Sequence, residues 1–152
     1  MGQISDCVNR LAASATFAMM QKSNELAAQG VNVVNMSVGE PDFNTPDYVK
    51  NAAKQAIDEN YSTYSPVPGY MSLRKACSDK LKRENNLDYA PTQIVVSTGA
   101  KQSLCNAIMA VVNPGDEVLL PSPCWVSYPE MVKLAGGVPV VIKAGIEQDF
   151  KV

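Results

Sequence analysis

The alternation of apolar and polar residues is most informative between residues 94 and 128. The apolar run Ile94–Val96 predicts a short strand that ends shortly before Gly99. Apolar residues then recur at helical spacing and predict a helix with one apolar face (Leu104, Ala107, Ile108, Val111 and Val112). Residues 113–116, Asn-Pro-Gly-Asp, break that helix, and Glu117–Leu120 predicts a second strand. The pattern therefore predicts a βαβ unit with a right-handed crossover.

The residues before this unit predict helices separated by irregular loops. Helical spacing of apolar residues predicts a helix over 16–28 that stops near Gly30, and Val33–Met36 predicts a short strand. The decapeptide SVGEPDFNTP at 37–46 contains one glycine and two prolines, so we expect a loop there. Thr45 as N-cap and Pro46 as first helical residue then predict the start of a helix.

Three further elements follow from the same reasoning. After Gly69 we expect a helix with one face inward (Tyr70, Leu73, Cys77 and Leu81) and a solvated cationic face (Arg74, Lys75, Lys82 and Arg83). Ser127 and Glu130 have the spacing of a capping box, which predicts a helix that ends at Gly136 and Gly137. Val138–Ile142 predicts a final strand. The whole pattern is that of an α/β fold.

Composition narrows the classes of function. The 152 residues carry a net charge of -2 without a Lys/Arg cluster, which argues against nucleic acid or an anionic membrane as partner. No apolar run approaches the length of a membrane span, and residues 1–10 do not resemble a signal peptide. The four cysteines are scattered, so we expect reduced thiols and a cytoplasmic protein without a zinc site. Without histidine, Ser/His and Cys/His catalysis are excluded.

Two features of the sequence suggest a binding site. A helix that begins just after Gly99 presents unpaired backbone N–H groups and the positive end of its dipole, so a phosphate would fit over Gly99, Ala100 and Lys101. Trp125, the single tryptophan, follows a predicted strand and precedes a helix, where it could stack on a flat ring or pack in the core. A glycine in a βα turn can also serve the backbone alone, so these residues suggest a phosphorylated ring compound without proving one.

Five ordered motifs together carry a resemblance to a known family. The chain resembles the N-terminal part of a class I, fold-type I aminotransferase that uses pyridoxal 5′-phosphate, and is most similar to bacterial aspartate aminotransferases. The motifs are RLAASATFAMMQKSNELAAQG, SVGEPDFNTP, YSPVPGYMSLRKA, VSTGAKQSL and NPGDEVLLPSPCWVSYPEMVKLAGG. The resemblance implies a three-layer αβα fold, here a truncated large domain of the aspartate aminotransferase type. It also implies that residues 1–45 form an N-terminal arm, a helix and a segment that contacts the small domain, and that 46–152 begin the cofactor-binding large domain.

The resemblance implies a role for particular positions. Gly99, Ala100 and Lys101 match the turn that holds the cofactor phosphate, and Trp125 matches the aromatic residue stacked on the pyridine ring. Tyr64 matches a tyrosine that reaches the phosphate of the neighbouring subunit, which implies a homodimer; from the residues alone it could equally be a packed surface tyrosine.

The same resemblance implies a substrate site. Gly39 matches the loop glycine whose backbone meets the substrate carboxylate. Ser14, Thr16 and Lys101 match groups that recognise the distal carboxylate of a dicarboxylic substrate, and Trp125 also borders the substrate. Cys124 departs from the tyrosine usual beside the tryptophan. The substrates implied are amino acids and keto acids, above all aspartate with 2-oxoglutarate giving oxaloacetate and glutamate.

The catalytic residues of the family have no match in this chain. The Schiff-base lysine, the aspartate that pairs with the pyridine nitrogen and the arginine that binds the substrate α-carboxylate all occur downstream of the last matched motif. We therefore expect this chain alone to be inactive and assign it no catalytic residue. Two alternatives remain at this point. One is another fold-type I enzyme that eliminates or cleaves, such as a C–S lyase, and the other is a non-catalytic cofactor-binding module.

Overall fold

The computed structural model describes residues 4–152. Contacts divide the chain into two compact units, which we describe separately. The first unit comprises the residues up to Glu40 together with Leu104–Val152, and the second comprises Pro41–Ser103. The boundary at residue 103 falls within helix α5 (Ala100–Val111). The domain boundary expected between residues 45 and 46 stays a prediction, because compact units and family domains are different divisions of a chain.

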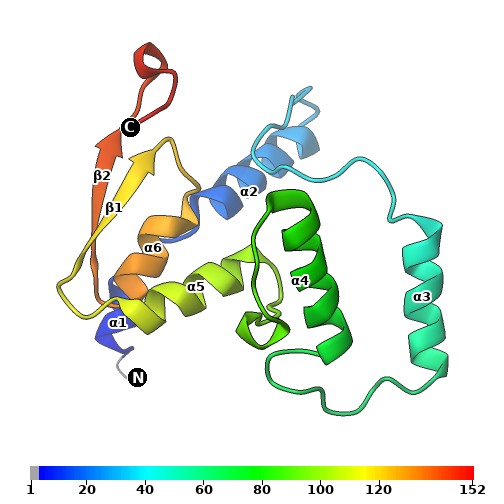
Figure 1. Cartoon of the computed structure of the whole chain (residues 1–152). Helices are drawn as coiled ribbons and strands as arrows, with labels where there is room; N and C mark the ends of the chain where they lie inside the picture. Colours follow the sequence, from blue (N-terminus) through cyan, green and yellow to red (C-terminus); the bar gives the residue numbers. More distant parts are fainter. Residues whose placement is uncertain (1–3) are drawn as a thin grey trace. The chain divides into compact units, whose positions relative to one another are not determined.

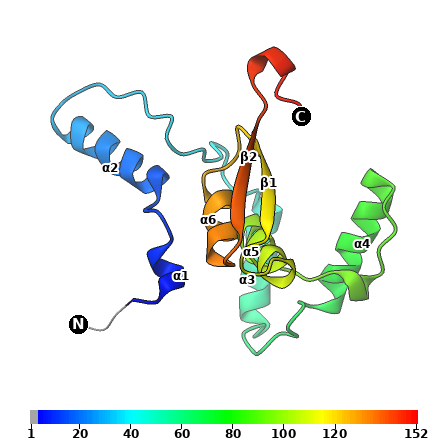
Figure 2. The ribbon, with the colours of Figure 1, turned by 90° about the vertical axis from the view of Figure 1, so that its left-hand side faces the viewer.

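A parallel βαβ unit forms the core of the first unit. Strand β1 (Glu117–Ser122) leads into helix α6 (Ser127–Leu134), and strand β2 (Val138–Lys143) returns beside β1 in parallel. The register runs from Glu117 opposite Val138 to Ser122 opposite Lys143. Figures 1 and 2 show the two strands side by side with α6 packed against one face. Both strands and the helix agree with the sequence-based prediction.

Packing between α6 and the two strands excludes water from a small apolar core. Val132 of α6 is fully buried, and its neighbours in the core are also buried (Leu120, Met131 and Ala144). The turn from α6 to β2 passes so close to this core that it requires glycine. A Cβ atom on Gly137 would lie 2.7 Å from Cγ1 of Val112 and 3.1 Å from Cγ1 of Val132. The Gly-Gly pair that ends α6 is therefore a packing requirement as well as a helix stop.

Two predicted strands are absent from residues 4–152, in which the structure pairs only β1 with β2. Ile94 is extended and the amide of Val96 donates to the carbonyl of Pro68, but the segment Ile94–Val96 enters no ladder. Val33–Met36 is also irregular, and the side chain of Asn35 accepts from both the amide and the hydroxyl of Ser37. A strand exists only where a neighbour satisfies its backbone groups, so apolar residues in a row predict a strand's location but not its partner.

Two further helices of the first unit lie toward the N-terminus. They are α1 (Asp6–Asn9) and α2 (Ala15–Ala28), and a short 3₁₀ turn, η2 (Ile146–Gln148), follows β2. Ser14 caps α2, because its Oγ accepts from the backbone N–H of Phe17 at 3.5 Å. The helix expected over 16–28 is thereby confirmed with one added residue. None of the helices within residues 4–152 is both long and apolar enough to cross a membrane.

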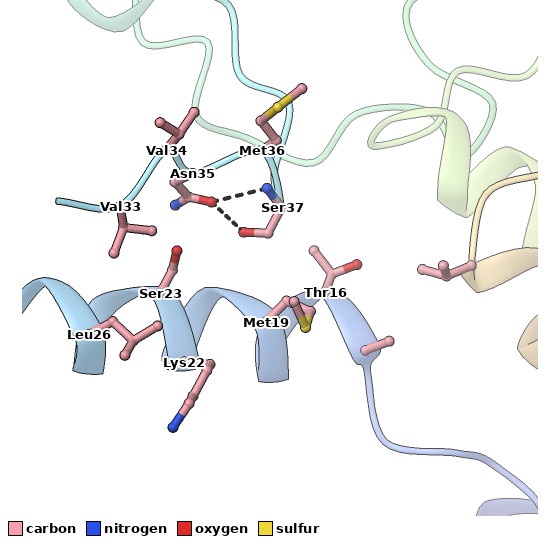
Figure 3. Close-up of a pocket in the computed structure, with 12 residues that line it drawn as sticks. Thr16, Met19, Lys22, Ser23, Leu26, Val33, Val34, Asn35, Met36 and Ser37 are labelled. Carbon is pink, nitrogen blue, oxygen red and sulfur yellow. Dashed lines mark hydrogen bonds between the residues drawn. The ribbon is translucent and has the colours of Figure 1, made fainter. Parts of the chain in front are cut away.

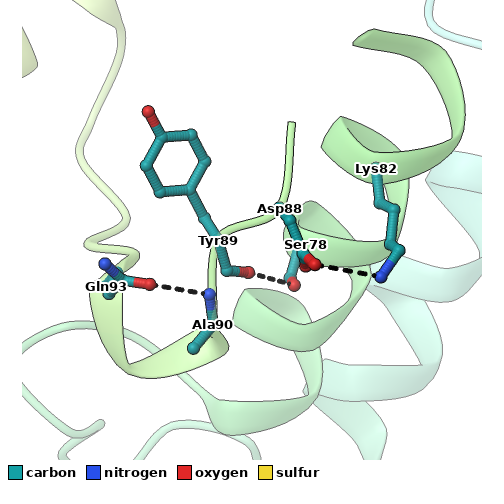
Figure 4. Close-up of polar contacts among 6 residues, drawn as sticks. All are labelled: Ser78, Lys82, Asp88, Tyr89, Ala90 and Gln93. Atoms are coloured by element: carbon teal, nitrogen blue, oxygen red, sulfur yellow. Dashed lines mark hydrogen bonds and ion pairs between the residues drawn. The ribbon is translucent and has the colours of Figure 1, made fainter. Parts of the chain in front are cut away.

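The second unit contains α3 (Asp47–Asp58), α4 (Met71–Asn85) and the 3₁₀ turn η1 (Pro91–Gln93). Helix α3 begins one residue later than expected, with Pro46 at the N-cap position in place of Thr45. Hydrogen bonds tie the chain after α4 back onto that helix (Figure 4). The hydroxyl of Ser78 donates to the carbonyl of Tyr89, and Nζ of Lys82 donates to Oδ2 of Asp88. Beyond the helix, Oε1 of Gln93 accepts from the amide of Ala90 within the turn η1.

Arg74 corrects the expectation of a fully solvated cationic face on α4. The residue is only 9% exposed, and its Nη1 donates to the carbonyl of Pro91 at 3.3 Å. Nη2 lies 3.8 Å from the sulfur of Met71. The long aliphatic part of arginine packs well between a helix and a neighbouring turn, so its charge does not decide its burial. Lys75, Lys82 and Arg83 are exposed as predicted.

Candidate cofactor and substrate site

The predicted site residues are divided between the two units. Tyr64, Gly99, Ala100 and Lys101 belong to the second unit. Ser14, Thr16, Gly39 and Trp125 belong to the first. Each group is therefore described within its own unit, and the assignment of all eight to one site stays a prediction.

The turn before α5 has a conformation that favours glycine. Gly99 has a φ of +81°, and a Cβ atom added to it would meet nothing within 4 Å, so the space beside the backbone is open. Helix α5 begins at Ala100, and the first turn of any α-helix directs N–H groups away from the helix. Oε1 of Gln102 in α5 accepts from the amide of Thr98, and this hydrogen bond links the turn to the helix that follows it. An open space next to a helix N-terminus fits the phosphate of the predicted cofactor.

Tyr64 stands at the tip of a loop in the same unit. Its side chain is fully exposed, with a relative accessible surface of 105%, and a shallow depression surrounds it, lined by residues 62–65. Tyr64 is therefore not packed against its own unit, because no residue of the unit covers the ring. A rigid, exposed phenol can form a hydrogen bond with a group outside its own unit.

Ser14 and Thr16 lie at the beginning of α2, each at the edge of a different cavity in the first unit. A cavity of about 550 Å³ separates α2 from the segment Val33–Ser37, and Thr16 lines it with Met19, Leu26 and Val126. Figure 3 shows Thr16 and Ser23 pointing from α2 toward this segment. A second cavity, of about 260 Å³, is lined by Ser14 and again by Val126.

Trp125 directly precedes Val126, which lines both cavities. Trp125 is 43% exposed, and its carbonyl accepts from the amide of Tyr128 in the turn that starts α6. The structure thus brings the start of α2 next to Val126, although 110 positions separate Thr16 from Val126 in the sequence. Ser37 lines the larger cavity, and Gly39 lies two residues after it in the sequence. Gly39 is exposed and has open space beside its Cα atom.

Glu130 is the residue that sequence reasoning placed wrongly. The predicted capping box requires its side chain to accept from the backbone at Ser127, but Ser127 is already helical and Val126 occupies the N-cap position. Instead, Oε2 of Glu130 accepts from the amide of Ala12 at 2.8 Å, and Oε1 lies 2.8 Å from Nζ of Lys133. The hydrogen bonds from Lys133 and Ala12 lower the pKa of Glu130 below its ordinary value. Only the tertiary structure could reveal a contact between residues 118 positions apart.

Within residues 4–152, no three His, Cys, Asp or Glu side chains gather as a possible metal site. The polar groups described above are backbone amides, hydroxyls and an aromatic ring, which suit an anion attached to a ring. Comparison with known proteins shows a match of residues 31–152 to the family model of class I and II aminotransferases. The chain belongs to this family. Class I and II aminotransferases depend on pyridoxal 5′-phosphate, the cofactor that the motifs predict.

Individual aminotransferases cover the chain almost completely. It is 51% identical over 151 residues to an aspartate/prephenate aminotransferase of Cereibacter sphaeroides, an alignment that covers 99% of this chain and 38% of that protein. It is 46% identical over 145 residues to an aspartate aminotransferase of a Bacillus species, covering 95% of this chain and 37% of that protein. The chain therefore spans somewhat more than a third of the length of these relatives.

Solved structures agree with the family assignment. The aspartate aminotransferase of Thermus thermophilus with maleate superposes with a TM-score of 0.93 at 44% identity, over 100% of this chain and 40% of that one. That of Rhizobium meliloti superposes with a TM-score of 0.94 at 37% identity, over 100% of this chain and 38% of that one. The predicted aminotransferase-type α/β fold is thereby confirmed, while the roles of single residues stay predictions.

Proposed function

We propose that this chain forms the N-terminal part of a pyridoxal-phosphate-dependent aminotransferase that transfers the amino group between aspartate and 2-oxoglutarate. The relatives are named aspartate or aspartate/prephenate aminotransferases, which supports transamination of aspartate over the elimination and cleavage reactions of other fold-type I enzymes. The observation that carries the proposal is the open, left-handed Gly99 at the start of α5, within a chain that belongs to this family. A cytoplasmic location, inferred from the scattered cysteines, is part of the proposal.

Each cofactor contact would come from a group that the chain already presents. The backbone amides of Ala100 and Lys101 would hold the phosphate at the positive end of the α5 dipole, and Gly99, whose own amide donates to the carbonyl of Ser97 at 2.9 Å, would leave room for it beside the turn. The indole of Trp125 would cover one face of the pyridine ring. The phenol of Tyr64 would donate a hydrogen bond to the phosphate held by a partner subunit, so that a homodimer shares each site. When bound, the cofactor supplies an electron sink for bonds to the amino-acid α-carbon.

The substrate would be recognised by Ser14, Thr16 and Gly39 of the first unit together with Lys101 of the second. The backbone at Gly39 would approach the α-carboxylate closely, because no side chain intervenes. Ser14, Thr16 and Lys101 would bind the distal carboxylate. The Oγ of Ser14 accepts from Phe17 as a helix cap, which leaves its O–H available to donate to a carboxylate oxygen. These contacts bind and orient, and we assign no proton transfer to residues of this chain.

Binding of pyridoxine 5′-phosphate tests the phosphate and ring contacts together. This alcohol keeps the ring and the phosphate but cannot react with surface lysines. Because Trp125 is the single tryptophan, stacking of the ring on its indole should quench the intrinsic tryptophan fluorescence. We expect saturable quenching that inorganic phosphate reverses by competition, and much weaker binding of pyridoxine, which lacks the phosphate.

A pair of matched glycine substitutions separates phosphate binding from backbone strain. Gly99 and Gly115 both have positive φ and open space beside Cα, at +81° and +91°. Gly99→Ala and Gly115→Ala therefore introduce the same kind of strain, but only the first lies at the start of α5. We expect Gly99→Ala to weaken pyridoxine 5′-phosphate binding about tenfold or more and Gly115→Ala to leave it unchanged. The proposal would be contradicted if both substitutions weakened pyridoxine 5′-phosphate binding equally, or if pyridoxine bound as tightly as its 5′-phosphate.

A further inference from the structure

The linker between α1 and α2 is attached to α6 through a single carboxylate. Oε2 of Glu130 accepts a 2.8 Å hydrogen bond from the backbone N–H of Ala12, while Oε1 lies 2.8 Å from Nζ of Lys133. The two carboxylate oxygens thus serve different partners, one on the linker and one on the carboxylate's own helix. Lys133 follows Glu130 by three positions, so both side chains lie on one face of α6.

The surroundings make this contact stronger than an ordinary surface ion pair. The side chains of Glu130 and Lys133 are 27% and 34% exposed, so each is partly withdrawn from water. Ionised acceptors form shorter and stronger hydrogen bonds with backbone N–H groups than neutral ones do. The ion pairs of α4 differ in this respect, because Glu84 pairs with Lys80 and Arg83 on an exposed face of its own helix.

The linker attached in this way leads directly to two predicted substrate-binding hydroxyls. Ala12 lies two residues before Ser14, which caps α2, and four residues before Thr16. The cavity of about 260 Å³ beside Val126 is bounded by the linker on one side and by Glu130 on the other. The hydrogen bond between Ala12 and Glu130 of α6 therefore sets where α2 begins relative to Trp125 and Val126.

We propose that Glu130 is a positioning residue that, held by Lys133, fixes the linker Leu11–Ser14 on α6 and so places the hydroxyls of Ser14 and Thr16 beside Val126. The attachment of the linker stands on the contacts alone. Its consequence for a dicarboxylate substrate rests on the proposed function. The two parts are therefore tested by different measurements.

Amide hydrogen exchange and trypsin cleavage measure the attachment. Arg10 is exposed and lies two residues before Ala12, so the Arg10–Leu11 bond becomes a better trypsin substrate when the linker detaches. We expect Glu130→Ala to raise both exchange of residues 11–16 and cleavage at Arg10 about tenfold, with exchange in β1 and β2 unchanged. Glu130→Gln should restore much of the protection, because its amide oxygen can still accept from Ala12.

A second variant tests the same contact from the linker. Ala12→Pro removes the N–H donor and leaves Glu130 intact, and it should loosen the linker to the same extent. The effects of Glu130→Ala and Ala12→Pro should not add in the double variant, since both remove one contact. Glu84→Ala, which removes an ion-paired carboxylate from α4, serves as the matched control and should leave residues 11–16 unchanged.

Succinate tests the consequence for the substrate. On the unsubstituted chain with pyridoxine 5′-phosphate present, succinate should further protect residues 13–17, and this added protection should be lost in Glu130→Ala and retained in Glu130→Gln. Wild-type exchange at residues 11–16 in Glu130→Ala, or a uniform rise over the whole chain, would overturn the positioning role. A loosened linker in Glu130→Ala without any effect of succinate on the unsubstituted chain would instead contradict the proposed substrate and leave the attachment standing.

Discussion

The two compact units bury very different kinds of residue. In the first unit the buried side chains are apolar and belong to β1, α6 and the residue that follows β2 (Leu120, Met131, Val132 and Ala144). In the second unit the buried side chain among the described residues is that of Arg74. Helix α3 of the second unit has one apolar face in sequence, yet the apolar residues Tyr48, Val49 and Ile57 are exposed.

The difference follows from how far along the chain the packing partners lie. A βαβ unit brings two strands and a helix together within 27 residues, from Glu117 to Lys143, so its apolar faces meet locally. An amphipathic helix such as α3 has no such neighbour within its own unit. An apolar helix face shows that a helix is built to pack, but it does not say against what.

The largest expected effect comes from placing a charge in the core of the first unit. Val132→Asp buries an unpaired carboxylate among Leu120, Met131 and Ala144, and should lower the free energy of unfolding by about 4 kcal/mol. Val49→Asp, on the exposed face of α3, should change it by no more than about 0.5 kcal/mol. Urea unfolding followed by Trp125 fluorescence and by circular dichroism measures both. Comparable losses would show that the contrast between the units is wrong.

Arg74 should be the most sensitive position of the second unit. Arg74→Ala removes the hydrogen bond to Pro91 and the packing of the side chain between α4 and η1, and should destabilise this region by about 2 kcal/mol. Lys75→Ala removes an exposed ion pair with Asp79 and should cost less than about 0.5 kcal/mol. Amide exchange over residues 91–96 reports the effect. Equal protection in both variants would mean that the buried guanidinium contributes nothing.

Exposed apolar surface should make the chain self-associate. We expect the mass measured by sedimentation equilibrium to exceed 16.3 kDa and to rise with concentration, because large exposed apolar patches favour association. Ile57→Lys should weaken this association about tenfold, or about 1.4 kcal/mol, if the α3 face takes part. Lys54→Gln, a change on the same helix that removes no apolar surface, is the control. A compact monomer at high concentration would contradict the prediction.

The smallest expected effect is a pH dependence at Glu130. Its hydrogen bonds with Lys133 and Ala12 lower its pKa in the folded state below the ordinary value of 4.5. The stabilisation is therefore fully present above the ordinary value and is lost as pH falls through the lowered pKa, and it should amount to less than about 1 kcal/mol. Unfolding measured between pH 7 and 3 should show this loss, and Glu130→Gln should remove that part of the dependence. An unchanged profile in Glu130→Gln would assign the acid sensitivity to other carboxylates.

Local sequence patterns predicted the elements that are stabilised by nearby residues. Helical spacing located α2, α4 and α5, and the Gly136–Gly137 pair marked the end of α6. Ordered motifs predicted the aminotransferase family, which the comparisons confirm. For the candidate site, the sequence indicated a glycine turn at Gly99 before a helix, and the structure gives that glycine a φ of +81°. These features depend on a few consecutive residues, whose conformational preferences the sequence contains directly.

Only the tertiary structure decided the features that depend on distant residues. Ile94–Val96 and Val33–Met36 read as strands but lack a pairing neighbour within residues 4–152. The sequence also gave no sign that Arg74 would be buried or that Glu130 would bind Ala12. Strand pairing, burial and long-range hydrogen bonds depend on which surfaces of the folded chain meet. A glutamate such as Glu130 can cap its own helix or bind the backbone of a segment 118 residues away. The local sequence limits these choices, and packing selects among them.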